Sequence, residues 1–137
     1  MKRIFLAIFV ILSTIICAKE FNFDHEEKIL EKEFHNNFSV VKLNKDTKLK
    51  DIDVDIDDDG GVEVEIKFDI TNPLTKDKID LYAKEISDLF KDKITKSVGN
   101  DFFLKKLEIE AKGSIEKITE NSKISRSIQA KEVYYYR

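Results

Sequence analysis

Hydrophobic and polar residues alternate strictly over two neighbouring stretches, residues 51–57 and 62–70. A period of two is typical of strands that bury one face, because successive side chains point to opposite sides of a β-strand. Residues 58–61 separate the runs with the sequence Asp-Asp-Gly-Gly, which tight turns favour. The pattern therefore predicts a β-hairpin. Its apolar positions are Ile52, Val54, Ile56, Val62, Val64, Ile66, Phe68 and Ile70.

The register of this hairpin follows from the requirement that both apolar sets share one face. Ile56 must lie opposite Val62 or Val64, because a slip of one residue would turn every side chain of a strand to the other face. That condition excludes a two-residue turn at the Asp-Gly pair, although such a pair favours one. We therefore expect a loop of odd length, formed by residues 58–60 with Gly60 in a left-handed conformation.

Apolar residues at helical spacing predict a helix that begins at Asp24. Glu27 follows three residues later, and this Asp-x-x-Glu pattern resembles a capping box, in which side chains satisfy the free N–H groups of the first turn. After the helix, the apolar residues between positions 40 and 43 predict an extended link or a short strand. The helical stripe consists of Ile29, Leu30, Phe34 and Phe38.

A longer stripe predicts a second helix over residues 74–98. Pro73 falls at its start, and Asn72 or Thr75 is the expected N-cap. Gly99 follows the last periodic residue, as is typical of a helix C-terminus. The stripe consists of Ile79, Tyr82, Ala83, Ile86, Leu89, Phe90, Ile94 and Val98.

Two further strands are predicted near the end of the chain. Apolar and charged residues alternate over residues 106–112, and a continuation past Gly113 to Ile115 stays open. Residues 121–123 predict a turn, and residues 125–136 predict a returning strand with a less regular pattern.

The predicted order of elements is therefore α-β-β-α-β-β. A helix that crosses between the hairpin and the later strands predicts an α+β fold, in which two helices pack on one face of a small antiparallel or mixed sheet of about four strands. The order from Asp24 to Lys112 resembles that of the BON domain, a small envelope module associated with lipid binding. Residues 68–71 (Phe-Asp-Ile-Thr) stand where that family usually has a glycine. A resemblance in element order implies a fold and supplies no function.

The first eighteen residues have the three parts of a secretory signal, and we expect them to form an N-terminal signal helix. Lys2 and Arg3 provide a basic start, an apolar run follows over residues 4–16, and Ala18 offers a cleavage point. Two forms of processing stay open. Signal peptidase could cut after Ala18, or Cys17 could be acylated at a loose lipobox in which Ile16 replaces the usual small residue.

The leader predicts that residues 19–137 form a single exported α+β domain. We expect it in the periplasm, outside the cell, or on a bacterial membrane through a lipid at Cys17. The chain has 24 basic and 27 acidic residues, and loss of Lys2 and Arg3 leaves 22 against 27, a net charge of −5. No basic stripe favours nucleic acid, and export argues against it. No other membrane contact is expected.

The outer face of the hairpin carries carboxylates opposite carboxylates in either permitted register. Like charges directly opposed cost about 0.2–1 kcal/mol per pair. The first interpretation is a solvated face that keeps the protein soluble and resists edge-to-edge pairing. The others are compensation by lysines on neighbouring strands, such as Lys106, Lys112 and Lys131, and a cationic partner. The protein-binding candidates here are Asp53, Asp55, Glu63 and Glu65, with Glu108 and Glu110 as extensions.

The hairpin loop also matches the first half of a calcium-binding loop. Asp55, Asp57 and Asp59 precede Gly60, but Ile66 stands where that pattern needs a bidentate glutamate. Aspartate and glycine are equally typical of a turn, so the sequence predicts no metal site and leaves the three aspartates as weak candidates. His25 and His35 lie ten residues apart, too few and too far apart for a zinc site.

Three consecutive tyrosines, Tyr134, Tyr135 and Tyr136, directly precede the last residue, Arg137. A terminal strand that packs its aromatic residues into the sheet is the first interpretation, and an exposed recognition cluster is the second. Because adjacent side chains point to opposite faces, we expect at least one of them to be partly exposed.

Nothing in the sequence predicts an enzyme. The chain has no nucleophile motif with an activating base and no glycine-rich phosphate loop, so no catalytic residue or cofactor is expected. The hypothesis is a small exported envelope or surface protein that acts as a binding or structural module through protein contacts. Its expected surface combines the acidic hairpin face with the tyrosine end. The alternative is an inhibitor or ligand-binding lipoprotein that captures a cationic protein or a divalent metal.

Overall fold

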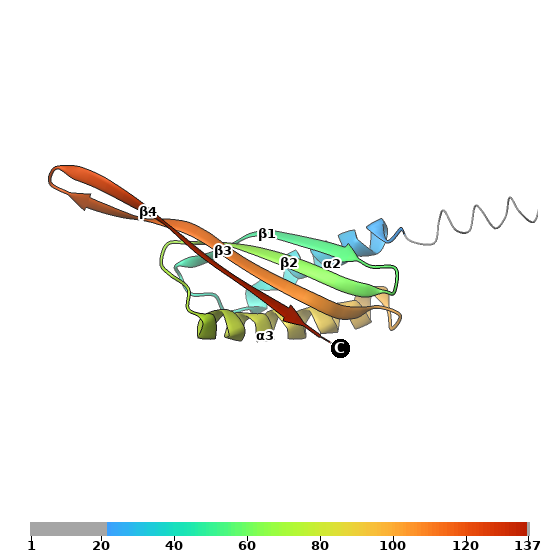
Figure 1. The fold of residues 1–137 in the computed structure, drawn as a ribbon. Coiled ribbons are helices and arrows are strands. Elements are labelled where there is room, and N and C mark those ends of the chain that lie inside the picture. Colours follow the sequence, from blue (N-terminus) through green and yellow to red (C-terminus); the bar gives the residue numbers. More distant parts are fainter. Residues whose placement is uncertain (1–21, 137) are drawn as a thin grey trace, which may run out of the picture.

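The computed structural model describes residues 22–136 (Figure 1). The predicted leader, including Cys17, lies outside these residues. Between residues 22 and 136, no helix is long and apolar enough to cross a membrane. The predicted order α-β-β-α-β-β is confirmed. The elements are α2 (Asp24–Asn37), the 3₁₀ turn η1 (Phe38–Val40), β1 (Thr47–Ile56), β2 (Gly61–Ile70), α3 (Lys76–Lys93), the π-helical turn η2 (Ile94–Val98), β3 (Phe103–Thr119) and β4 (Ser122–Tyr135).

The strands form one mixed sheet with the spatial order β1-β2-β3-β4. The pairs β1–β2 and β3–β4 are antiparallel, whereas β2 and β3 are parallel. A parallel pair needs a long crossover connection, and α3 provides it. Of the two sheet types that the sequence left open, the structure therefore has the mixed one.

The hairpin register agrees with the prediction. Ile56 lies opposite Val62, and the Asp57 N–H donates to the Gly61 carbonyl at 2.9 Å. The loop between them is residues 58–60, and Gly60 has a φ of 84°. An odd loop with a left-handed glycine is thus confirmed, because a shift of one residue would turn the apolar residues of one strand away from the core.

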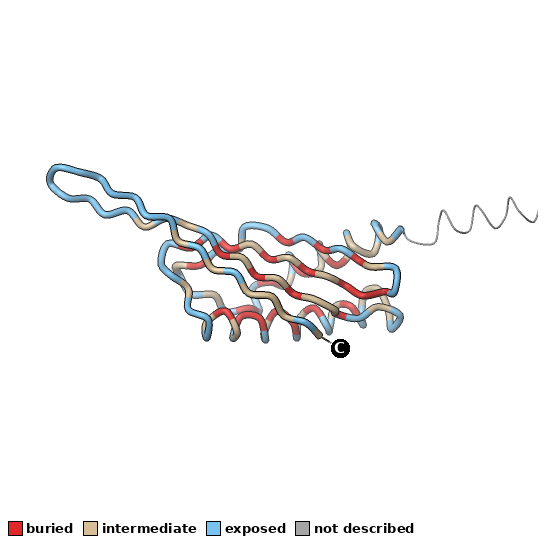
Figure 2. Tube along the Cα trace, in the orientation of Figure 1, coloured by how far each residue is buried: buried red, intermediate tan, exposed pale blue. Residues whose placement is uncertain are grey.

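The core lies between one face of the sheet and the two helices (Figure 2). Leu30 and Phe34 of α2 are fully buried, and the Phe34 ring packs 4.1 Å from that of Phe90 on α3. All five apolar residues of β2 are buried, because the sheet presents them to the helices. Within residues 22–136, no helix covers the opposite face of the sheet.

The start of α2 differs from the predicted capping box. Asp24 is the first helical residue, and Phe23 occupies the N-cap position without a side-chain hydrogen bond. The Asn22 side chain instead accepts from the Asp24 N–H at 3.1 Å. Glu27 does not reach back to the helix start, because its carboxylate accepts a hydrogen bond from the backbone of β1. The capping-box prediction was therefore wrong.

The ends of the second helical segment agree with the prediction. The Thr75 hydroxyl accepts from the Lys78 N–H at 3.3 Å and caps α3. Gly99 ends the segment with a φ of 114°. Residues 40–43 are not a strand: η1 continues the first helix, and the chain then runs irregularly to β1.

The last two strands extend further than the sequence indicated. β3 pairs with β2 as far as Gly113, which lies opposite Ile70, the last residue of β2. Beyond that point β3 and β4 continue as a two-stranded ribbon, residues 114–127, which we call the arm. Figure 1 shows the arm projecting past the rest of the sheet, and Figure 2 shows it exposed along most of its length.

Candidate functional site

Five carboxylates lie side by side on the open face of the sheet, and we call them the acidic face. On the hairpin, Asp55 lies opposite Glu63, and Asp53 lies opposite Glu65. On the next strand Glu108 lies opposite Glu65, so one row across the sheet has an acid on each of three strands. The members are Asp53, Asp55, Glu63, Glu65 and Glu108.

The alternation of side chains along each strand determines which face the five carboxylates occupy. Val54 and Val64 point into the core, so their acidic neighbours point away from it. Asp53 and Asp55 are exposed, and the three glutamates of the acidic face are half-buried by their neighbours. Together with Val64 and Lys106, the five carboxylates line a shallow hollow of about 180 Å³.

The lysines that the sequence offered as compensation neutralise only part of this surface. Lys131 pairs with Glu108 at 3.1 Å, and Lys112 pairs with Glu110 at 2.7 Å. These contacts raise the pKa of Lys131 and lower that of Glu110. Lys106 faces Glu63 without forming an ion pair shorter than 4 Å within the described chain.

The acidic face is least neutralised on β1. Within residues 22–136, Asp53 and Asp55 have no ion pair. Glu65 has a distant one, with Lys67 at 3.8 Å. The acidic face therefore retains a strong negative charge beside the free edge of the hairpin.

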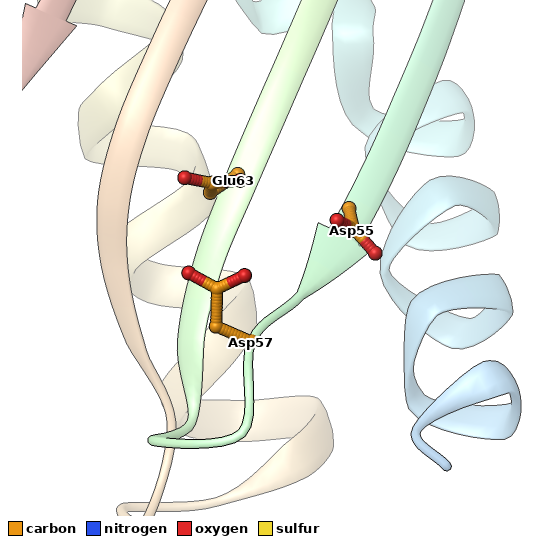
Figure 3. A group of neighbouring side chains, drawn as sticks. All are labelled: Asp55, Asp57 and Glu63. Atoms are coloured by element: carbon orange, nitrogen blue, oxygen red, sulfur yellow. The ribbon is translucent and has the colours of Figure 1, made fainter. Parts of the chain in front are cut away.

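Near the hairpin loop, one carboxylate oxygen from each of Asp55, Asp57 and Glu63 lies within 4.8 Å of the other two (Figure 3). Divalent cations such as calcium bind oxygen ligands of this kind. Of the three weak metal candidates, the structure brings together Asp55 and Asp57 and adds Glu63. Asp59 is not in the group, because its side chain accepts from the Gly61 N–H at 2.9 Å.

A lysine that the sequence did not single out lies beside this group. Lys105 donates to Asp57 at 2.8 Å and to Asp59 at 3.4 Å. The hydrogen bond to Asp57 is the main reason that the pKa of Lys105 is raised, while the Gly61 N–H and Lys105 lower the pKa of Asp59. The lysine sits at a register shift where β3 passes β2, which no local pattern predicts.

The structure separates the three tyrosines. Tyr135 lies on the open face opposite Lys106 and is 77% exposed, as expected for at least one of them. Tyr134 and Tyr136 point to the other side, toward α3. The expected surface that joins the acidic face to all three tyrosines is therefore corrected: only Tyr135 shares its face.

Both inward tyrosines contact α3. The Tyr134 hydroxyl donates to Asp80 at 2.5 Å, and burial together with this contact raises the pKa of Tyr134. The Lys91 ammonium lies 4.9 Å from the centre of the Tyr136 ring, and burial raises the pKa of Tyr136. These contacts fasten the end of β4 to the helix, which agrees with the first interpretation of the tyrosines.

The free edge of β1 is closed by carboxylates. The outward N–H groups of Val54 and Ile56 donate to Glu31 at 3.1 Å and to Glu27 at 2.9 Å, both on α2. The Ile52 N–H donates to the Asp51 side chain at 2.9 Å. An edge strand whose N–H groups are taken in this way is a poor template for a further strand.

His25 and His35 are both exposed on α2.

Comparison with models of protein families, with curated proteins and with solved structures finds no match for this chain. The similarity to the BON domain therefore stays a resemblance in the order of elements.

Proposed function

We propose that this chain is an exported, non-enzymatic envelope or surface protein that acts as a binding or structural module through protein contacts. The acidic face is its contact surface, with Tyr135 at the rim. Membrane contact is limited to a lipid on Cys17 where that residue is acylated. Intact mass of the protein from its own host distinguishes the acylated form from one cut after Ala18.

One observation carries the proposal: among the described residues, no element packs on the outer face of the sheet, and opposed carboxylates lie on it. Asp53 and Glu65 face each other directly, and Glu108 continues the row. Opposed like charges destabilise a sheet. A partner that carries lysine or arginine would remove this repulsion on binding, and complementary charge would also speed association.

Crosslinking in host cells tests the proposal. The variant Asp53→Asn/Glu65→Gln removes two charges from the acidic face. The control Asp101→Asn/Glu120→Gln removes the same number of charges from exposed positions elsewhere. We expect a crosslinked neighbour with the original chain and with the control, and its loss in the acidic-face variant. Equal recovery from all three proteins would contradict the proposal.

The second candidate function is capture of a divalent metal or a cationic protein by an inhibitor-like or ligand-binding lipoprotein. The specific observation in its favour is the convergence of Asp55, Asp57 and Glu63. A ligand that binds only the folded state raises its melting temperature. A rise with millimolar calcium that is lost in Glu63→Gln would support metal capture, and no rise would exclude the calcium version.

A further inference from the structure

The two edges of the sheet differ in whether their backbone groups have partners. On β1, carboxylates take the outward N–H groups of Ile52, Val54 and Ile56. On β4, at the other edge, no hydrogen bond within the described residues reaches an outward backbone group. β4 spans Ser122–Tyr135, so this open edge is long.

The pairing with β3 identifies the outward residues of β4. The Tyr136 N–H donates to the Lys105 carbonyl at 2.9 Å, so even-numbered residues of β4 direct their backbone groups toward β3. The N–H and carbonyl groups of odd-numbered residues, from Lys123 to Tyr135, therefore point away from the sheet. A long edge of this kind is a template for an added strand.

We propose that this edge pairs with β4 of a second copy of the chain, antiparallel and centred on Gln129. Such a contact is isologous, because each copy contributes the same surface. In this register Arg126 of each copy lies opposite Glu132 of the other. The outward pair Lys131 and Ser127 would exchange backbone hydrogen bonds, as would the two Gln129 residues with each other.

The side chains favour this register. Besides the two Arg126–Glu132 pairs, Ile124 lies opposite Tyr134, and no like charges face each other. Moving the centre to Ile128 or to Ala130 keeps the same faces together but loses both charge pairs. Glu132 would then lie opposite an isoleucine in either case, so electrostatic complementarity selects Gln129 as the centre.

The proposed pairing also accounts for the arm. A two-stranded ribbon is marginally stable alone, yet the arm, residues 114–127, extends past the rest of the sheet. In the dimer the arm of each copy lies beside the last residues of the other copy's β4. Ile124, which is 56% exposed, would be covered by Tyr134, and Lys123 would lie opposite Tyr135, which is 77% exposed.

The dimer would be one continuous sheet with α2 and α3 of both copies on one side. Antiparallel strands of one sheet are related by a twofold axis perpendicular to it, so both acidic faces would lie on the same open side. Two linked sites of this kind bind a bivalent partner more strongly than either alone. The pairing uses none of the acidic-face residues, so its failure is distinguishable from failure of the proposed function.

Sedimentation and native mass spectrometry of the whole chain, expressed with its own N-terminal segment, test the pairing. We expect a dimer that dissociates on dilution. Gln129→Pro removes an outward N–H without breaking a β3–β4 hydrogen bond, since proline is tolerated at a strand edge. It should raise the dimer Kd by about tenfold or more, whereas Gln129→Ala should not. A monomer at hundreds of micromolar would overturn the proposal.

A charge exchange tests the register itself. Arg126→Glu alone and Glu132→Arg alone place like charges at both symmetric contacts, so each should weaken the dimer about tenfold or more. Mixing these two variants should restore a dimer that contains one copy of each, because both contacts then join opposite charges. The register would be overturned if each single variant dimerised as strongly as the original chain, or if mixing the two variants restored no dimer.

Hydrogen exchange supplies a readout for each residue. Protection of odd-numbered amides between Lys123 and Tyr135 should rise with protein concentration, and that of even-numbered amides should not. Concentration-dependent protection elsewhere, with none along β4, would show that copies associate through another surface and would overturn the proposal.

Discussion

Glu27 on α2 accepts a hydrogen bond at 2.9 Å from the backbone N–H of Ile56, the last residue of β1. This contact fastens the first helix to the edge of the sheet. Glu27→Ala would leave the N–H without its partner and should lower the free energy of unfolding by about 1–2 kcal/mol. Glu27→Gln keeps an oxygen acceptor and should change it by less than about 0.5 kcal/mol. Urea unfolding of both variants checks this, and equal losses would contradict it.

The same residue makes stability depend on pH. Partial burial raises the pKa of Glu27 above its ordinary value of 4.5, and the charges of Asp55 and Asp24 add to the effect. Because the pKa of Glu27 is raised in the folded state, its contribution to stability is complete below the pKa of the unfolded state. That contribution is lost as the pH rises through the pKa of the folded state. The unfolding free energy of the original chain minus that of Glu27→Gln should therefore be larger at pH 4.5 than at pH 7. A pH-independent difference would contradict this.

Tyr134 provides a test of how β4 is held. Its hydroxyl donates to Asp80, and hydrogen bonds to charged groups are the stronger ones. Tyr134→Phe should cost about 1–2 kcal/mol of unfolding free energy. The matched control Tyr135→Phe changes an exposed tyrosine and should cost less than about 0.5 kcal/mol. Equal costs would show that the contact with Asp80 contributes nothing to stability.

Gly113 marks the point where β3 leaves β2 and the arm begins. A Cβ at this position would overlap the carbonyl group of Ile70, which is backbone and cannot move aside like a flexible side chain. Gly113→Ala should therefore lower the free energy of unfolding by about 1–3 kcal/mol. Ser114→Ala, one residue along the exposed arm, is the control. Thermal and urea unfolding that show no difference between the two variants would contradict this account.

The sequence predicted those parts of the fold in which apolar residues must be buried on one face of a strand or helix. A slip of one residue would bury Glu63 in place of Val62, so the alternation required an odd loop and left Ile56 opposite either Val62 or Val64, of which the structure has Val62. The same reasoning placed Asp53 and Asp55 on the open face. The helical stripe over α3 was predictable for the same reason. Its N-cap was narrowed to Asn72 or Thr75, and the structure has Thr75.

The parts that the sequence did not predict depend on residues far apart in the chain. A period of two does not say which strand lies next to β2, so the parallel pairing with β3 stayed open. Glu27 suits a helix cap as well as it suits the Ile56 N–H, 29 residues away. Lys105 reaches the hairpin loop only because the register of β3 shifts beside β2. The arm is exposed on both faces, so burial imposes no pattern on it.

We expect the opposed charges of the acidic face to lower the stability of the fold, a cost that a cationic partner would offset. The most direct measurement is the unfolding free energy of Asp53→Asn/Glu65→Gln at low salt, compared with Asp101→Asn/Glu120→Gln. We predict a gain of about 0.2–1 kcal/mol in the first variant only, and we expect the gain to shrink as salt screens the charges. A loss of stability, or a gain equal to that of the control, would contradict the claim.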